Sequence, residues 1–147
     1  DIVVTTQDWH IDPGDHFSSN PDFVDSWPPH GVAGTDEAEI HPAVAEIPVD
    51  AHVKKGQYAA AYSGFEGTTK GGSSLETILR DHRIEAVDVV GLALSHCVKD
   101  TALDAQHLGF TTTCLTDLSE PVSLESGEAA VAAMEDAGVT VTTSSQL

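Results

Sequence analysis

The sequence is poor in basic residues, in cysteine and in long apolar runs, and each shortage argues against a class of function. Only 6 Lys and Arg stand against 24 Asp and Glu, a net charge of -18 that repels phosphate backbones and anionic membranes. We therefore expect no nucleic-acid or membrane partner, and the acidic excess indicates a salt-adapted or simply very soluble surface. No apolar run reaches the ~18 residues that cross a bilayer and no leader opens the chain, which predicts a cytoplasmic protein. Two cysteines are too few for a disulfide framework.

Side chains that bind metals are concentrated near the start of the chain. Asp8 and His10 follow the apolar run 2–4, and His16 and His30 lie in the Pro- and Gly-rich segment that comes next. If a strand continues through Asp8 and His10, their side chains leave the same face. Such nitrogen and oxygen ligands suit Zn²⁺, Mn²⁺ or Fe²⁺ better than Ca²⁺ or Mg²⁺. The alternative is a surface loop that scatters imidazoles without binding an ion, and the spacing alone does not separate the two.

The remainder of the chain predicts alternating strands and helices in one domain, 1–147. The segment 11–49 has no sustained period and is interpreted as a long functional loop. A capping box from Ser73 to Glu76 opens a helix, and a nearly continuous apolar run predicts a strand covered on both faces. We expect strands at 51–55, 86–94, 110–116 and 139–142, and helices at 73–82, 97–108 and 126–137. This order predicts an α/β fold, a parallel sheet with helices on both faces.

Cys97 lies where the apolar strand 86–94 gives way to a helix, at a carboxyl end where ligands of parallel sheets collect. A helix N-terminus favours thiolate over thiol, although a small buried cysteine filling the junction is the alternative. His96 is a poor base for its own neighbour, because adjacent helical residues diverge by about 100°. Lys55 would lower the pKa of the thiol if it lay nearby, but it also fits a solvated surface residue. Cys114 is expected to be a buried strand residue.

Several motifs along the chain occur in an order typical of one protein family. They are the segments 8–18, 27–30 (Trp-Pro-Pro-His), 55–56 (Lys-Gly), 61–67 and 89–98, the last ending in His-Cys-Val. Together they resemble the nicotinamidases and pyrazinamidases among the isochorismatase-like cysteine hydrolases, from Ile2 to near the C-terminus. The resemblance implies the family's three-layer fold and hydrolysis of nicotinamide to nicotinate and ammonia in NAD salvage, with pyrazinamide as a second plausible substrate.

The resemblance also implies one divalent metal ion. Asp8, His10 and His30 would bind it, with His16 a further ligand in some members, and the pyridine nitrogen of nicotinamide would complete the coordination. The ion would mainly orient the ring and hold water. Zn²⁺, Mn²⁺ and Fe²⁺ all fit, and the sequence does not select among them.

The same resemblance implies the roles of the other site residues. The Cys97 thiolate would attack the carboxamide to form a thioester, assisted by Lys55, while the N–H groups of Ala93 and Cys97 form the oxyanion hole. Members usually have a non-proline cis peptide just before the position of Ala93. Trp27 and Tyr62 would line the ring pocket, and Tyr62 fits an ordinary packing aromatic equally well.

The sequence departs from the family at its start. Members begin with one more strand and helix, and that strand carries a catalytic Asp; here Asp1 opens directly on the expected second strand. A fragment of a longer protein, a second chain that supplies the strand, and an inactive homologue all fit. The rival functions are hydrolysis of another small amide or a vinyl ether, and a non-enzymatic metal-binding module. A homo-oligomer is left open.

Overall fold

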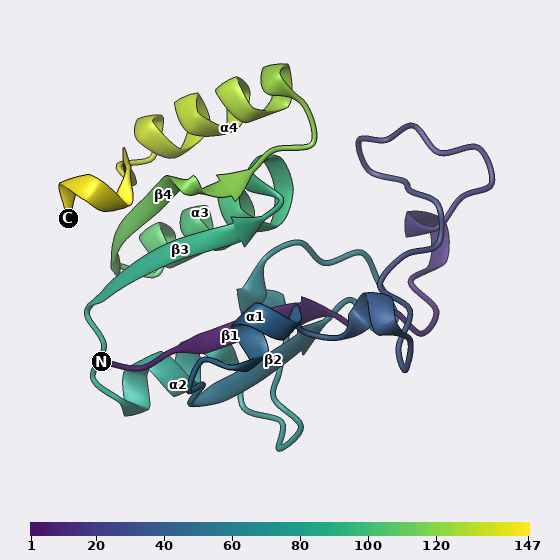
Figure 1. Cartoon of the computed structure of the whole chain (residues 1–147), viewed down its shortest axis with the longest axis horizontal. Helices are drawn as coiled ribbons and strands as arrows, with labels where there is room; N and C mark the ends of the chain where they lie inside the picture. Colours follow the sequence, from purple (N-terminus) through teal and green to yellow (C-terminus); the bar gives the residue numbers. More distant parts are fainter. The chain divides into compact units, whose positions relative to one another are not determined.

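The computed structural model describes residues 1–147, which divide into two compact units (Figure 1). Asp1–Ile78 is named the N-terminal unit and Leu79–Leu147 the C-terminal unit. Both contain parallel strands, as the alternating pattern predicted. That the two units form a single domain stays a prediction.

The N-terminal unit contains a two-stranded parallel sheet. β1 (Val4–Asp8) pairs with β2 (Ala51–Lys55), which has the bounds that the sequence predicted. In this register Asp8 lies opposite Lys55. Because parallel strands point the same way, both residues leave the sheet at its carboxyl edge, where polar side chains gather.

The segment between β1 and β2 is mostly irregular, as predicted. Short helical turns interrupt it: η1 (Gly14–His16), η2 (Asp36–Ala38) and α1 (Pro42–Ala45). Isolated parallel bridges join His10 to Val32 and Phe17 to Trp27. The loop is therefore ordered by its own backbone hydrogen bonds, which fold it back beside the end of β1.

The remainder of the N-terminal unit contains η3 (Gly64–Glu66) and the start of α2 (Leu75–Asp81), within which the boundary between the units falls. The predicted cap at Ser73 is wrong by one residue, because the Oγ of Ser74 accepts the N–H of Thr77 at 3.1 Å. Gly64 packs closely, since a Cβ there would lie 2.6 Å from a methyl of Thr6 on β1.

The C-terminal unit contains a parallel sheet in the order β3-β4-β5, with a helix after each of the first two strands. Its elements are β3 (Ala86–Leu92), the π-helical turn η4 (Leu94–Val98), α3 (Lys99–His107), β4 (Thr111–Glu120), α4 (Leu124–Asp136), β5 (Thr140–Thr142) and η5 (Ser144–Gln146). Every predicted helix and strand of this half is present. The boundaries differ most at β4, which extends to Glu120 because a register shift after Val89 lets Gly91 pair with Ser119.

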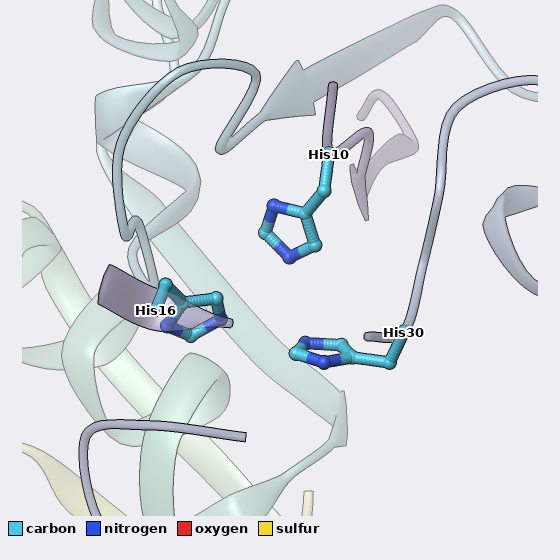
Figure 2. Close-up of side chains that lie close together, drawn as sticks. All are labelled: His10, His16 and His30. Atoms are coloured by element: carbon cyan, nitrogen blue, oxygen red, sulfur yellow. The ribbon is translucent and has the colours of Figure 1, made fainter. Parts of the chain in front are cut away.

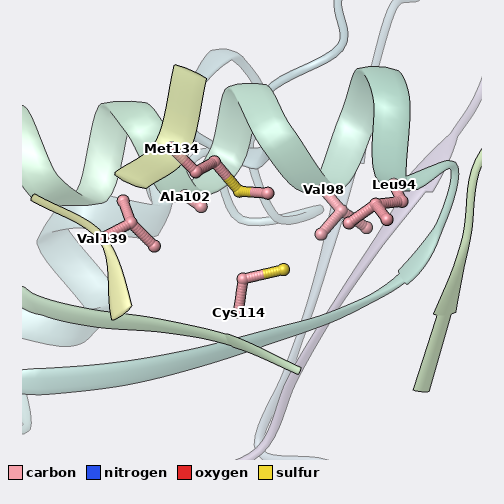
Figure 3. Close-up of a cluster of buried hydrophobic side chains, with 6 residues drawn as sticks. All are labelled: Leu94, Val98, Ala102, Cys114, Met134 and Val139. Carbon is pink, nitrogen blue, oxygen red and sulfur yellow. The ribbon is translucent and has the colours of Figure 1, made fainter. Parts of the chain in front are cut away.

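The core of the C-terminal unit lies on one face of its sheet. Figure 3 shows the buried side chains that meet there, from η4, α3, β4, α4 and the residue before β5: Leu94, Val98, Ala102, Cys114, Met134 and Val139. Both α3 and α4 thus pack on the face of the sheet that carries the Cys114 side chain. The prediction that β3 is covered on both faces is wrong for this chain, since Val90 and Leu92 on its other face are 48% and 75% exposed. Neither α3 nor α4 reaches them because both helices pack against the opposite side.

Candidate metal centre and active site

Asp8 and His10 lie side by side at the carboxyl end of β1. The strand ends at Asp8 rather than continuing through His10, because beyond Asp8 the backbone turns to bond the segment around Val32. The N–H of His10 donates to the carbonyl of Gly31 at 2.9 Å. The two side chains still face one another, with His10 Nε2 at 3.7 Å from Asp8 Oδ2.

Three imidazoles from distant parts of the loop converge beside Asp8. The potential ligand atoms of His10, His16 and His30 all lie within 4.8 Å of one another, and Figure 2 shows the rings facing a common centre. His10 and His16 are almost fully buried, and His30 is half-buried. The structure thus brings together all four residues that the sequence proposed as metal ligands.

Two of these histidines are oriented by backbone carbonyls. Nδ1 of His10 lies 2.6 Å from the Gly56 carbonyl oxygen, and Nδ1 of His30 lies 2.8 Å from that of Pro28. Since a carbonyl only accepts, each bonded ring nitrogen carries the proton, and the other nitrogen is left with a lone pair. Metal-binding histidines are oriented in this way in other proteins.

Two of the inward-facing nitrogens are buried without any hydrogen-bond partner. These are Nε2 of His10 and Nδ1 of His16. Buried polar atoms are nearly always satisfied, so such a pair needs a partner that the protein itself does not supply. A divalent cation of the borderline kind supplies it, and the donor set of imidazole nitrogens and one carboxylate fits Zn²⁺, Mn²⁺ or Fe²⁺. The residues present therefore fit a metal ion.

Gly56, at the end of β2, makes room for the first of these imidazoles. A Cβ at this position would lie 2.6 Å from Cε1 of His10 and 2.7 Å from its Nδ1, and the backbone φ of +74° also favours glycine. The Lys-Gly motif thus has a physical reason that sequence reasoning missed: the carbonyl of Gly56 orients His10, and its missing side chain lets the ring approach.

Lys55 is bound to Asp8 rather than exposed to solvent. Its Nζ donates to Asp8 Oδ1 at 2.5 Å and to the carbonyl of Ala61 at 3.1 Å, and the side chain is almost fully buried. Burial alone would raise the pKa of Asp8, but its interactions with His10 and Lys55 outweigh burial and hold that pKa well below its usual range. The alternative of a solvated surface lysine is therefore wrong, and Asp8 is ionised, with Oδ2 turned toward the histidines.

The histidines do not share one electrostatic environment. Burial lowers the pKa of His16, and the neighbouring imidazoles of His10 and His30 lower it further. Burial would also lower the pKa of His10, but the adjacent Asp8 carboxylate outweighs it and raises that pKa. His16 is accordingly neutral at pH 7, the form of imidazole that binds metals.

Aromatic rings border the histidine site. Trp27 Nε1 donates to the hydroxyl of Tyr62 at 3.2 Å, and the ring of Tyr62 lies 5.7 Å from that of His16. The structure therefore brings together the two residues that were expected to line a ring pocket. Phe17, to which sequence reasoning gave no role, packs within 5.3 Å of the rings of both His10 and His30. Its position directly after His16 was the available signal.

The Cys97 thiol lies in the C-terminal unit, on the π-helical turn η4. The helical turn begins at Leu94, so the predicted helix start at Cys97 is wrong by three residues; the carbonyl of Ala93 accepts the N–H groups of His96 at 3.0 Å and Val98 at 3.1 Å. The Leu92–Ala93 peptide bond is cis, as the family resemblance implied. The thiol is half-buried. The nucleophile role of Cys97 and the oxyanion-hole role of Ala93 stay predictions.

The ring of His96 contacts the residue before it, and the expectation that His96 is a poor base for Cys97 stays a prediction. His96 Nδ1 lies 2.9 Å from the hydroxyl of the buried Ser95, which also accepts the N–H of Val122 at 3.1 Å.

Cys114 is fully buried, and burial raises its pKa to about 11. It is a core residue, as predicted.

The fold and the site define an α/β protein with a cluster of three histidines that could hold a metal ion. The model of the Isochorismatase domain matches residues 2–146, and the chain belongs to this family. It is 48% identical over 143 residues to the nicotinamidase/pyrazinamidase of Mycobacterium tuberculosis, an alignment that covers 97% of this chain and 77% of the relative. None of its helices has the length and apolar character to cross a membrane.

Solved structures agree with this assignment. The pyrazinamidase of Pyrococcus horikoshii in complex with zinc superposes with a TM-score of 0.80 at 33% identity, covering 97% of this chain and 75% of that one. PnC1 from L. infantum in complex with nicotinate gives a TM-score of 0.82 at 34% identity, covering 97% and 71%. The predicted α/β fold of isochorismatase type is confirmed.

Proposed function

We propose that this chain is a metal-dependent cysteine amidohydrolase that converts nicotinamide to nicotinate and ammonia. The observation that carries the proposal is the convergence of three imidazoles, two of them oriented by backbone carbonyls, with a carboxylate, beside the Trp27–Tyr62 pair. The kinship with nicotinamidases supports it, and so does the likeness to structures that hold zinc and nicotinate. Pyrazinamide, a ring carboxamide of similar size, is the second substrate.

The proposed cofactor is one divalent metal ion. His10 Nε2, His16 Nδ1, the second ring nitrogen of His30 and Asp8 Oδ2 would hold it. A metal ion supplies a Lewis-acidic anchor for a pyridine nitrogen and for bound water. Because Lys55 already occupies Oδ1 of Asp8, we expect only one oxygen of that carboxylate to bind.

In the proposed reaction the Cys97 thiolate adds to the carboxamide carbon of nicotinamide, and the N–H groups of Ala93 and Cys97 stabilise the resulting oxyanion. The nitrogen of the tetrahedral species takes up the proton that the thiol lost, and the carbonyl re-forms as the carbon–nitrogen bond breaks, which releases ammonia and leaves a thioester on the sulfur. Water then adds to the thioester carbon, and the bond to sulfur breaks to release nicotinate and restore the thiol.

Lys55 is proposed to provide a fixed positive charge at the site rather than to transfer a proton. Its ammonium group is buried between the Asp8 carboxylate and the Ala61 carbonyl, so it keeps Asp8 ionised beside the histidines. A fixed cation would also favour the thiolate over the thiol in the reacting complex.

The decisive measurement is ammonia release from nicotinamide by this chain, with and without a chelator. We expect release that a chelator abolishes and that added Zn²⁺, Mn²⁺ or Fe²⁺ restores. Tight metal retention without release would favour the metal-binding module instead, and release from another small amide but not from nicotinamide would favour a different hydrolase of the same family. Participation in NAD salvage and a cytoplasmic location stay predictions, and the oligomeric state is left open.

A further inference from the structure

An exposed carboxylate, Asp22, organises the loop between His16 and Trp27. Its Oδ1 accepts the N–H groups of Val24, Asp25 and Ser26, each at 2.9 Å. The hydroxyl of Ser26 donates to the same oxygen at 3.0 Å and accepts the N–H of Asp22 at 2.9 Å. These hydrogen bonds, that of Val24 first, hold the pKa of Asp22 well below its usual range.

The turn that Asp22 fixes is connected to the histidine site at two points. On one side, the turn leads through Ser26 directly into Trp27, whose backbone pairs with that of His16. On the other side, the carbonyl of Val24 accepts the hydroxyl of Tyr62 at 3.4 Å, and that hydroxyl accepts Trp27 Nε1.

The base of the loop is closed by backbone bonds. The N–H of Trp27 donates to the carbonyl of His16 at 2.8 Å, and the N–H of Ser18 donates to the carbonyl of Trp27 at 2.9 Å. His16 and Trp27 therefore stand on facing arms of one loop, and Asp22 lies at the turn between them. Each peptide unit is planar, so a carboxylate that holds an N–H group of this turn also holds the carbonyl of the same peptide unit in place.

We propose that Asp22 is a positioning residue for the metal and ring site. Its carboxylate holds the turn so that the backbone bond between Trp27 and His16 keeps the Nδ1 atom of His16 directed at the other imidazoles, and so that the Val24 carbonyl keeps Tyr62 against Trp27. The metal part of this inference follows from the geometry of the chain itself, whereas the ring part rests on the proposed function.

The test is the Zn²⁺ dissociation constant of the metal-free chain and its variants. Asp22→Ala removes the acceptor and should weaken Zn²⁺ binding about tenfold, as loss of groups that orient metal-bound histidines does elsewhere. Asp22→Asn keeps an acceptor oxygen in place and should restore most of the affinity. Asp36→Ala removes the same charge from an exposed position in the same unit and should leave the affinity unchanged.

At saturating Zn²⁺, Asp22→Ala should raise the KM for nicotinamide while kcat changes little, because the ring pocket loosens and the thiol chemistry does not. If the chain hydrolyses no nicotinamide but the Zn²⁺ affinities follow the expected order, the proposed function fails and the positioning role stands. Wild-type Zn²⁺ affinity in a folded Asp22→Ala variant overturns the role, and so does an Asn variant as weak as Ala. If Asp22→Ala does not fold, Ser26→Ala decides: weaker Zn²⁺ binding supports the role, and unchanged binding overturns it.

Discussion

The histidine site and the surroundings of Cys97 are held together by different interactions. Around the histidines, ring nitrogens bond backbone carbonyls and a carboxylate bonds a buried lysine, so order depends on polar contacts within a long loop. Around Cys97, the turn is anchored by apolar side chains such as Leu94 and Val98, which pack into a core with α3 and α4. A substitution that disrupts one region should therefore leave the structure of the other region unchanged, and variants can test this.

The largest expected effect separates turnover from metal binding. Cys97→Ala removes the proposed nucleophile and should lower kcat by about 10⁴-fold or more while metal content stays at the wild-type level. His30→Ala should lower metal occupancy instead, which elemental analysis of the purified chains measures. Cys114→Ala is the matched thiol control and should keep its turnover. Equal metal loss in the Cys97 and His30 variants would contradict these roles.

Next in size is a change in the core of the C-terminal unit. Met134 has no exposed surface, so Met134→Ala should lower the free energy of unfolding by about 2–5 kcal/mol, as truncation of buried large side chains does. Denaturant unfolding measures it, with the exposed neighbour Glu135→Ala as the control. The Zn²⁺ affinity of the folded variant should match wild type, and a large change would mean that the two regions are coupled.

A smaller effect is expected at Gly56. In Gly56→Ala the new methyl would meet the imidazole of His10, which must tilt away, so Zn²⁺ affinity should fall about 10- to 100-fold. Gly72→Ala controls for backbone strain, because Gly72 also has a positive φ of +89° but nothing within 4 Å of the added Cβ. Similar Zn²⁺ affinities in both variants would show that strain rather than contact with His10 is at work.

The smallest effect concerns the C-terminal end of the sheet. The carboxylate of Asp117 accepts hydrogen bonds from the N–H of Ser144 at 2.9 Å and from the hydroxyl of Ser144 at 2.6 Å. These hydrogen bonds lower the pKa of Asp117. Because the folded-state pKa is the lower one, the contribution to stability is present above the unfolded value of about 3.9 and is lost as pH falls through the folded value. Asp117→Asn should therefore lower Tm slightly at pH 7, and the difference from wild type should shrink toward pH 3. A constant difference would point to another cause.

The sequence predicted the C-terminal unit more fully than the histidine site. Apolar patterning and residue propensities placed every helix and strand there, because burial of one face determines those elements. It failed at boundaries that depend on individual hydrogen bonds, such as the start of η4, where two N–H groups converge on the carbonyl of Ala93. The exposed face of β3 was also missed, since an apolar run does not say whether anything covers it.

For the histidine site, the sequence identified the residues but not what arranges them. Ligand types and motif resemblance selected Asp8, His10, His16 and His30, and the structure brings all of them together. The carbonyls of Gly56 and Pro28 that orient two of the rings have no signature in residue type, because every residue has a carbonyl. Asp22 was missed for a similar reason, since an exposed acid in a chain with 24 acidic residues carries no signal of its own.

The sealed position of Cys114 has a practical consequence. Its sulfur has no exposed surface and a pKa of about 11, so an alkylating reagent at neutral pH reaches it only when the sheet and helices around it separate. Cys97, being half-buried, should be labelled first. Counting modified sulfurs by mass spectrometry over time would therefore record how often the interior of this half of the chain opens, without any added probe.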